Sequence, residues 1–187
     1  MLEKKKILRK IIKVRVSAIS AEEKAKREKL LLDNLFSMPE FLAANTVMLF
    51  ANLPDEIGTF SLIDKCIAMG KKVFLPVING DDMTACEFKG EYKIGKYDIK
   101  EPLTPHSSLF PNGHQHVLTP HSVDFILVPG VAFSPNGYRL GRGKGYYDKF
   151  LSKYSNLFTV GVCFREQFYL DIPTEPHDIP MHRVLVI

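Results

Sequence analysis

The residues of this sequence best suited to chemistry lie in segment 139–145, where three glycines alternate with arginine and lysine in the run Arg-Leu-Gly-Arg-Gly-Lys-Gly. Glycines at every second position remove side chains where a backbone must bend or approach a ligand closely. After Gly145 no helix breaker follows, and Tyr147, Phe150 and Leu151 lie at helical spacing. The loop is therefore predicted to lead into a helix. Backbone N–H groups at a helix start, with basic side chains beside them, predict an anion site, most naturally for phosphate.

This segment matches neither of two common phosphate-loop motifs, G-x-x-x-x-G-K-[ST] and G-x-G-x-x-G. A glycine-rich hairpin with solvated basic residues therefore stays open as the alternative. Asp148 favours the functional interpretation, because it lies in the first turn of the predicted helix. Beside a polyphosphate its carboxylate would be repelled unless a divalent cation lay between them, which indicates Mg²⁺–nucleotide chemistry. The alternative is an aspartate that only complements the helix dipole.

The elements that must position this loop are an apolar strand before it and a helix after it. The apolar run 125–128, bounded by Pro129-Gly130, predicts a buried strand, and Ser-Pro-Asn-Gly at 134–137 predicts a turn. Further strands are predicted at 46–51, 71–78, 83–88, 157–163 and 183–187, and further helices at 20–36 and 60–69. This alternation predicts an α/β fold with a largely parallel sheet flanked by helices, formed as a single domain over residues 1–187.

Local signals mark several helix ends and loops. Ser20-Ala-Glu-Glu23 is a capping box, and Thr59 is the predicted N-cap of helix 60–69. Residues 92–102 are predicted to form a loop. In the following polar stretch, 104–122, His114 and His116 could chelate a metal, but their spacing matches no common zinc pattern, which favours a plain surface loop.

The first sixteen residues predict a basic helix that packs on the core. Residues 1–15 carry seven lysines and arginines against one acid, Glu3, and an apolar stripe at helical spacing includes Ile7 and Ile11. A solvated basic face is the common outcome for such a run, and a nucleic-acid patch is the alternative. The net charge of +4 is too small to imply nucleic acid by itself, and suits anionic small ligands.

Composition favours an ordinary globular protein of the cytoplasm. The 187 residues are 45% hydrophobic and 25% charged, which is typical of globular domains. The N-terminal segment is charged, so no secretory signal is expected, and no apolar run of 18 residues predicts a membrane span. Cys66, Cys86 and Cys163 are odd in number and widely separated, which indicates reduced thiols.

Taken together, several motifs resemble those of one known family. The segments Pro129–Phe133 and Gly137–Asp148 are similar to the signature of 5-formyltetrahydrofolate cyclo-ligases. Shorter matches occur in the family's order along nearly the whole chain, in the segments Lys5–Arg9, Asp55–Thr59, Gly70–Pro76 and His177–Pro180. The resemblance implies the α/β fold shared with sugar-phosphate isomerases and CoA transferases.

The resemblance also implies a set of site residues. Lys144, Arg142 and Tyr147 would be catalytic. ATP would be bound by Lys5, Lys6, Ile7, Leu8, Arg9, Arg139, Leu140, Gly141, Arg142, Gly143, Lys144, Gly145, Tyr146 and Tyr147. The folate would be bound by Ala51, Glu56 and Tyr146, and Mg²⁺ by Asp148 and Asp178. From position alone, Glu56 follows the predicted strand 46–51, where α/β folds bind ligands, and an exposed loop acid is the alternative.

The implied reaction is the ATP- and Mg²⁺-dependent cyclisation of 5-formyltetrahydrofolate, with or without a polyglutamate tail. Its products are 5,10-methenyltetrahydrofolate, ADP and phosphate, formed through a phosphorylated formyl group. No nucleic-acid or membrane partner is expected. Two rivals stay open: a non-catalytic nucleotide- or RNA-binding domain of the same fold, and an ATP-dependent kinase or ligase with a different formamide or acid substrate.

Overall fold

The computed structural model describes residues 1–94, 100–102, 123–154 and 157–187. Its centre is a six-stranded sheet in the order β10-β9-β6-β1-β2-β3. The strands are β1 (Thr46–Met48), β2 (Lys72–Asn79), β3 (Asp82–Phe88), β6 (Phe125–Val128), β9 (Phe158–Cys163) and β10 (Arg183–Val186). All neighbours run parallel except β2 and β3, which form an antiparallel hairpin. The predicted α/β class with a largely parallel sheet is thus confirmed.

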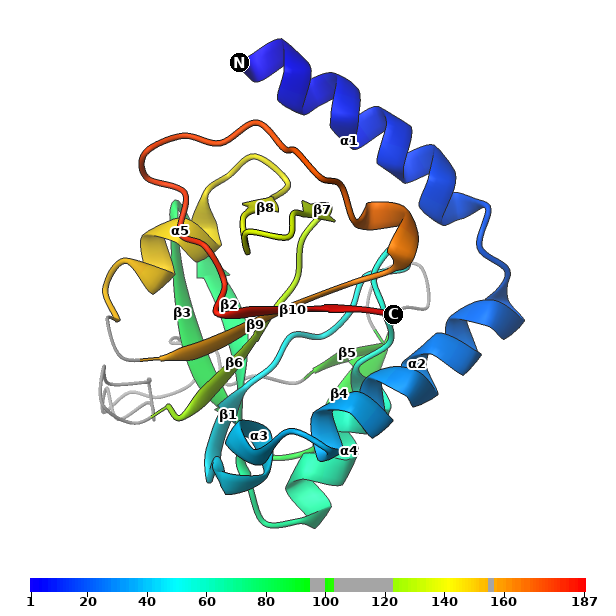
Figure 1. Cartoon of the computed structure of the whole chain (residues 1–187). Coiled ribbons are helices and arrows are strands. Elements are labelled where there is room, and N and C mark those ends of the chain that lie inside the picture. Colours follow the sequence, from blue (N-terminus) through cyan, green and yellow to red (C-terminus); the bar gives the residue numbers. More distant parts are fainter. Residues whose placement is uncertain (95–99, 103–122, 155–156) are drawn as a thin grey trace.

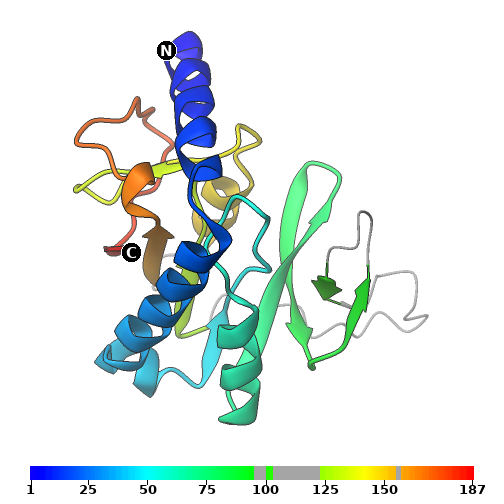
Figure 2. The same ribbon diagram turned by 90° about the vertical axis from the view of Figure 1, so that its right-hand side faces the viewer.

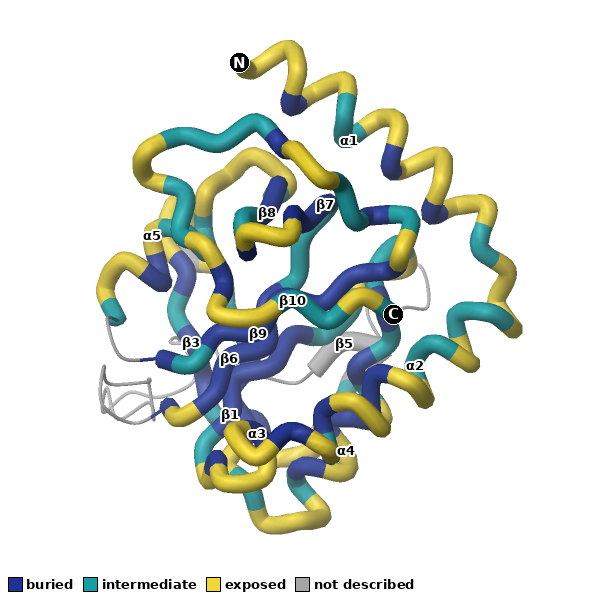
Figure 3. The backbone as a smooth tube through the Cα atoms, in the orientation of Figure 1, coloured by how far each residue is buried: buried dark blue, intermediate teal, exposed yellow. Residues whose placement is uncertain are grey.

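Helices cover both faces of this sheet (Figures 1 and 2). They are α1 (Leu2–Ser17), α2 (Ala21–Phe36), α3 (Pro39–Ala43), α4 (Phe60–Ala68), α5 (Tyr146–Leu151) and the 3₁₀ helix η3 (Arg165–Gln167). Strand β6 contributes side chains to the apolar cores on both faces of the sheet. Phe125 and Leu127 join the apolar core under α1 to α4, whereas Ile126 and Val128 join a second core that contains Phe150 of α5. This alternation follows from the two-residue repeat of a strand. The inner strands β6 and β9 are buried, whereas the edge strand β10 is partly exposed (Figure 3).

The predicted basic helix 1–16 corresponds to α1, which packs on the rest of the chain through buried Ile12 and Val16. The capping box is also confirmed in part, because the Ser20 hydroxyl accepts a hydrogen bond from the Glu23 N–H at 3.1 Å. The single-domain boundary 1–187 and the named isomerase-like fold stay predictions.

One local prediction is confirmed in part and another was wrong. Thr59 is the N-cap residue of α4, as predicted, but its hydroxyl makes no cap hydrogen bond. The hydroxyl instead donates to the Phe50 carbonyl and accepts from the Asn52 N–H, which ties together the loop after β1. Residues 92–102 are not simply a loop, since β4 (Tyr92–Ile94) and β5 (Lys100–Pro102) form a two-stranded antiparallel sheet. Tertiary contacts explain this, because the Tyr92 ring packs on Phe60 and Phe88.

Strand β1 ends at Met48, three residues before the predicted end of this strand. The Leu49 N–H still donates to the Phe74 carbonyl of β2, and the chain from Phe50 onward leaves the sheet and lines the cavities described below. The histidines of 104–122 lie outside the described residues. Among the helices that the structure describes, none is long and apolar enough to cross a membrane.

Candidate active site

The glycine-rich loop is held in place by a short hairpin of β7 (Ala132–Phe133) and β8 (Arg139–Leu140). Gly137 in the intervening turn has φ +81°, and a Cβ there would lie 2.3 Å from the Met181 carbonyl oxygen, so only glycine fits. The predicted turn at 134–137 is thus confirmed. This hairpin delivers Arg139 from a buried strand to the start of the loop.

The loop turns into α5 as the glycine spacing predicts. Gly145 adopts a left-handed conformation at φ +67° and precedes the first helical residue, Tyr146. Gly143, at φ +104°, lies against the Arg9 guanidinium, and the Arg9 Nε donates to the Gly141 carbonyl at 2.8 Å. Since α5 has only six residues, its dipole is small, and an anion here would depend mainly on basic side chains and loop amides.

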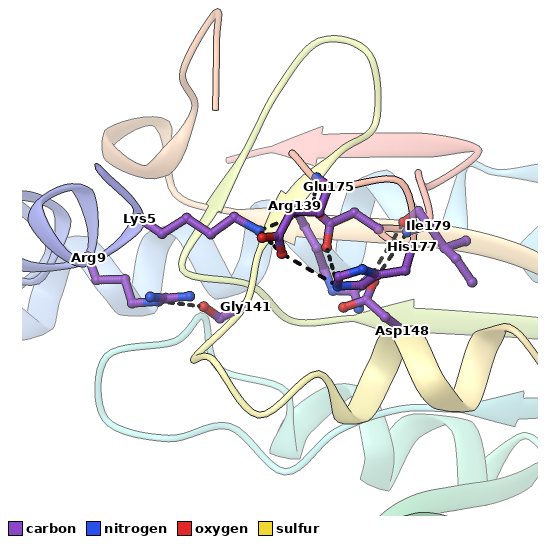
Figure 4. Close-up of polar contacts among 9 residues, drawn as sticks. Lys5, Arg9, Arg139, Gly141, Asp148, Glu175, His177 and Ile179 are labelled. Atoms are coloured by element: carbon purple, nitrogen blue, oxygen red, sulfur yellow. Dashed lines mark hydrogen bonds and ion pairs between the residues drawn. The ribbon is translucent and has the colours of Figure 1, made fainter. Parts of the chain in front are cut away.

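Above this loop, α1 closes a charged cavity of about 540 Å³. Its charged lining consists of Lys5, Arg9, Arg139, Lys144, Asp148, Lys149, Glu175 and Asp178. Figure 4 shows how α1 directs Lys5 toward Glu175 and Arg9 toward Gly141 of the loop. A lining that carries both positive and negative charges suits a polyphosphate with a divalent cation. The cationic side chains neutralise the phosphates, and the carboxylates neutralise the metal.

Three ion pairs, made by two buried cations, organise the charged cavity. The buried Lys5 Nζ lies 3.0 Å from Glu175 Oε2 and 3.3 Å from Asp178 Oδ2. The buried Arg139 Nη2 lies 2.9 Å from Asp148 Oδ1, which also accepts from the Ile179 N–H at 3.2 Å. Burial lowers the pKa of Arg139, and the charge of Asp148 opposes that shift. The pairing therefore keeps a desolvated guanidinium charged.

A second cavity, of about 360 Å³, lies on the other side of the same loop. We call it the apolar cavity, because its walls include Phe50, Leu53, Ile78, Met83 and Tyr147. Its volume is within the range of small-molecule sites. Five residues line both cavities: Arg139, Gly141, Lys144, Gly145 and Asp148. Two ligands bound in the two cavities would therefore meet across one loop.

Glu56 supplies an anionic group to the apolar cavity, in addition to the shared Asp148. Its Oε2 accepts from the Leu53 N–H at 2.9 Å, and its Oε1 lies 3.0 Å from Arg142 Nη2, which also contacts Asp55 at 2.7 Å. The Glu56 side chain is only 10% exposed. A carboxylate fixed at both oxygens is oriented for a ligand that presents hydrogen-bond donors.

The Tyr147 hydroxyl is buried and has no hydrogen-bond partner among the described residues. Burial raises its pKa, the negative charge of Glu56 raises it further, and Arg139 opposes the shift. The hydroxyl thus stays protonated at neutral pH. A buried polar group without a partner is costly, so a bound ligand in the apolar cavity is the natural acceptor.

A third, small basic cavity of about 160 Å³ lies under α1, lined in part by Arg9, Lys13, Asp55 and Arg142. It borders the apolar cavity, since Gly130 and Arg142 line both. Asp55 is half-buried; that burial raises its pKa, but the Arg142 hydrogen bond, with help from the Lys13 charge, lowers it overall. The cavity therefore combines three cations with one ionised acid.

The structure brings together most residues that the sequence predicts for a site. Those that line the charged or apolar cavity are Lys5, Arg9, Ala51, Glu56, Arg139, Leu140, Gly141, Arg142, Gly143, Lys144, Gly145, Tyr146, Tyr147, Asp148 and Asp178. Three others lie elsewhere on α1: Lys6 and Ile7 are exposed, and Leu8 packs against the core. Arg142 borders the apolar and small basic cavities, and its contacts are with Asp55 and Glu56.

Sequence reasoning missed Glu175, Lys149 and Lys13 as cavity residues. Glu175 lies three residues before Asp178 and donates its own N–H to Asp178 Oδ2 at 2.7 Å. The proximity of these two acids in a proline-rich loop was a usable signal. Lys149 and Lys13 resemble other surface lysines in sequence, and only the fold distinguishes them.

The fold and its two joined cavities define an α/β protein built to hold an anionic ligand beside a mostly apolar one. The model of the 5-formyltetrahydrofolate cyclo-ligase family matches residues 1–187, and the chain belongs to this family.

Similar proteins agree with that assignment. The mouse 5-formyltetrahydrofolate cyclo-ligase is 28% identical over 193 residues, covering 97% of this chain and 92% of the mouse protein. A probable 5-formyltetrahydrofolate cyclo-ligase of Caenorhabditis elegans is 30% identical, covering 98% and 92%. The solved structure of the Aquifex aeolicus 5,10-methenyltetrahydrofolate synthetase superposes with a TM-score of 0.78 at 31% identity, covering 97% of this chain and 89% of that one.

Proposed function

We propose that this protein uses ATP and Mg²⁺ to convert 5-formyltetrahydrofolate to 5,10-methenyltetrahydrofolate, ADP and phosphate. One observation supports this most: the charged cavity and the apolar cavity share the loop 139–148 as a common wall. ATP in the first and folate in the second would place a phosphate beside the formyl group. Family membership and the relatives' names support the same reaction.

The charged cavity is the proposed nucleotide site. Lys5, Arg9, Lys144 and the loop amides would neutralise the phosphates, and Arg139 would contribute its charge from the buried side. Lys144 is exposed and lines both cavities, so it is placed for the phosphoryl group in transfer. Phosphoryl transfer depends mainly on such positioning and charge neutralisation.

Asp148 and Asp178 are the proposed ligands of Mg²⁺. Within the described residues, the short contacts of Asp148 fall on Oδ1 and those of Asp178 on Oδ2. Among the same residues no hydrogen bond falls on the second oxygen of either carboxylate, and Asp178 Oδ1 lies 3.9 Å from His177 Nε2. Carboxylate oxygens are the donors that Mg²⁺ prefers. When bound, the ion would neutralise charge on the phosphates, so the residues present fit the metal.

The apolar cavity is the proposed folate site. A pterin ring presents an amino group and a ring N–H as adjacent donors, and the Glu56 carboxylate can accept both. The protonated Tyr147 hydroxyl would donate to an oxygen of the bound folate, which gives that buried group a partner. Ala51 and Tyr146 line the same cavity and complete the proposed contacts.

The chemistry then needs no protein nucleophile. The formyl oxygen attacks the γ-phosphorus of ATP, the bond from that phosphorus to the bridging oxygen breaks, and ADP leaves. N10 of the folate attacks the phosphorylated formyl carbon, loses its proton, and the carbon–oxygen bond breaks to release phosphate. The protein's part is to hold the formyl oxygen in line with the phosphate and to exclude water.

The small basic cavity is the proposed site for the carboxylates of the folate's glutamate tail, including a polyglutamate. It adjoins the apolar cavity, and its cations exceed its acids by two. We place the enzyme in the cytoplasm, in keeping with the burial of its three cysteines, and expect no nucleic-acid partner.

A single mixing experiment tests the proposed function. Purified protein is incubated with ATP, Mg²⁺ and 5-formyltetrahydrofolate, and the absorbance of the methenyl product is followed over time. We expect absorbance to rise only when all three are present, with one ADP formed per methenyl product. A folded protein that binds nucleotide but forms no product would reduce the assignment to a non-catalytic binding domain. Turnover of ATP with other formamides alone would assign a different substrate.

A further inference from the structure

The β2–β3 hairpin extends beyond the end of its neighbour β1 (Figure 2). Strand β1 pairs with β2 only over Lys72–Phe74, whereas β2 and β3 pair as far as Asn79 and Asp82. Ile78 and Met83, in the outer half of the hairpin, line the apolar cavity. The Ile78 side chain is 57% exposed. The position of Ile78 and Met83 as a wall of the apolar cavity therefore depends on the contacts that hold the hairpin tip.

Helix α5 grips that tip with two donors from one of its faces. The Tyr146 hydroxyl donates to the Gly80 carbonyl at 3.1 Å, and the Lys149 Nζ donates to the Asp81 carbonyl at 3.3 Å. The two residues are three apart, which places them side by side on a helix. A third contact, Lys153 to Asp82 at 3.6 Å, joins two exposed side chains and contributes little.

The same short helix is fixed at its base. Phe150 and Leu151 belong to the apolar core that also contains Met83 and Ala85 of β3. Helix α5 also carries Asp148, and Lys149 borders the charged cavity. The helix thus connects the loop shared by both cavities to the far wall of the apolar cavity.

We propose that Lys149 is a positioning residue for folate binding. By holding the hairpin tip against α5, it sets the distance between Ile78 and Met83 on one side and the shared loop on the other. The identity of the ligand rests on the proposed function, but the hairpin contact does not. A wall displaced by about 1 Å is enough to impair a site that depends on alignment.

The test is Lys149→Met, which keeps the apolar stem and removes the donor. Two properties are measured without nucleotide, because Lys149 also borders the charged cavity: amide hydrogen exchange of residues 78–83, and the Kd for 5-formyltetrahydrofolate. We expect faster exchange and a Kd raised about threefold to tenfold, the range for loss of one hydrogen bond. Lys149→Arg should restore most of both. Lys29→Met, an exposed lysine on α2, is the matched control and should change neither.

Unchanged exchange at the hairpin in Lys149→Met overturns the proposal, whatever the enzyme's activity. Faster exchange with an unchanged folate Kd also overturns it, because the hairpin would then not set the site. If Lys149→Arg behaves like Lys149→Met in both measurements, the change comes from a disturbed helix α5 and not from the missing donor. That result also overturns the proposal. Absence of folate binding in the unmodified protein would instead reject the proposed function, while the exchange comparison would still decide the hairpin contact.

Discussion

Arg139 and Asp148 form an ion pair, 2.9 Å from Nη2 to Oδ1, inside the wall that separates the two main cavities. The Arg139 side chain is only 3% exposed and that of Asp148 is 18% exposed. Eight residues, which form the glycine-rich loop and the start of α5, lie between them in sequence. Each depends on the other, because the arginine requires an anion in its desolvated position and the aspartate is oriented by the arginine. Asp148 therefore has two roles: it neutralises the buried Arg139, and it is a ligand in the proposed metal site.

The first prediction separates these tasks with Asp148→Asn. Asparagine still accepts from the Ile179 N–H but leaves the buried Arg139 without its anion, so the free energy of unfolding should fall by about 3 kcal/mol. Activity should fall by at least about tenfold and recover in part as Mg²⁺ is raised. Thermal unfolding and a Mg²⁺ titration of the rate measure the two effects.

Asp82→Asn is the matched control, since Asp82 is exposed and makes only a distant pair with Lys153. It should leave both stability and Mg²⁺ dependence unchanged. If Asp148→Asn loses stability but keeps the Mg²⁺ dependence of the unmodified protein, Asp148 is a structural partner of Arg139 and not a metal ligand.

The second prediction concerns Glu56→Gln. Glutamine keeps the size and one acceptor but replaces the other acceptor with a donor, which opposes the donors of a pterin ring. Folate binding should weaken by ~2–3 kcal/mol, because a partly desolvated polar contact is left unsatisfied, while ATP binding stays nearly constant. Calorimetric titration with each ligand measures this. Asp55→Asn also removes a contact of Arg142 but should affect folate much less. Equal effects of the two substitutions would return Glu56 to the role of a loop acid.

The third prediction uses pH. Arg27 of α2 grips Glu166 of η3 with contacts of 2.5 and 3.1 Å. The hydrogen bond from Arg27 lowers the pKa of Glu166 below its ordinary value of 4.5, against the effect of burial. A lowered folded-state pKa gives stability that is present above pH 4.5 and lost as pH falls through the folded pKa.

Glu166→Gln should therefore cost about 1 kcal/mol in the free energy of unfolding near neutral pH. The difference from the unmodified protein should vanish in acid, where both side chains are uncharged. Denaturant unfolding at several pH values tests this. Glu22→Gln, at an exposed i,i+4 pair with Lys26, should show no such difference. A cost for Glu166→Gln that is the same at all pH values would exclude the ionic origin.

How far the sequence predicts this site depends on how local each signal is. Gly143, Gly145 and the turn at 134–137 are local backbone requirements, and the structure confirms them. Gly141 is different, because its φ is not positive and a Cβ there would meet no atom within 4 Å. The ion pair of Lys5 with Glu175 spans 170 positions, and no local pattern encodes such a pair. The same holds for Lys149, whose acceptor is a backbone carbonyl on a hairpin 68 residues earlier.

The secondary structure likewise divides into elements that local sequence predicts and elements that depend on tertiary contacts. Continuous apolar runs predicted the buried strands, because a strand that is covered on both faces is apolar at successive positions. The pair β4 and β5 was missed, because its formation depends on Tyr92 packing against Phe60 and Phe88, which come together only in the folded chain. The Thr59 hydroxyl similarly bonds across the loop to Phe50 instead of to its own helix, a tertiary choice between two acceptable partners.

The last prediction tests the small basic cavity through Lys13→Ala. Lys13 is exposed, so the fold should tolerate the change. The Michaelis constant for 5-formyltetrahydrofolate should rise about threefold to fivefold, as expected for loss of one solvent-exposed ion pair, and at least as much for its triglutamate. The Michaelis constant should not change for 5-formyltetrahydropteroate, which lacks the glutamate. Lys10→Ala, also exposed on α1, is the control and should affect none of the three substrates. An equal rise for all three with Lys13→Ala would mean that Lys13 acts on the reaction generally, and the glutamate tail would have to bind elsewhere.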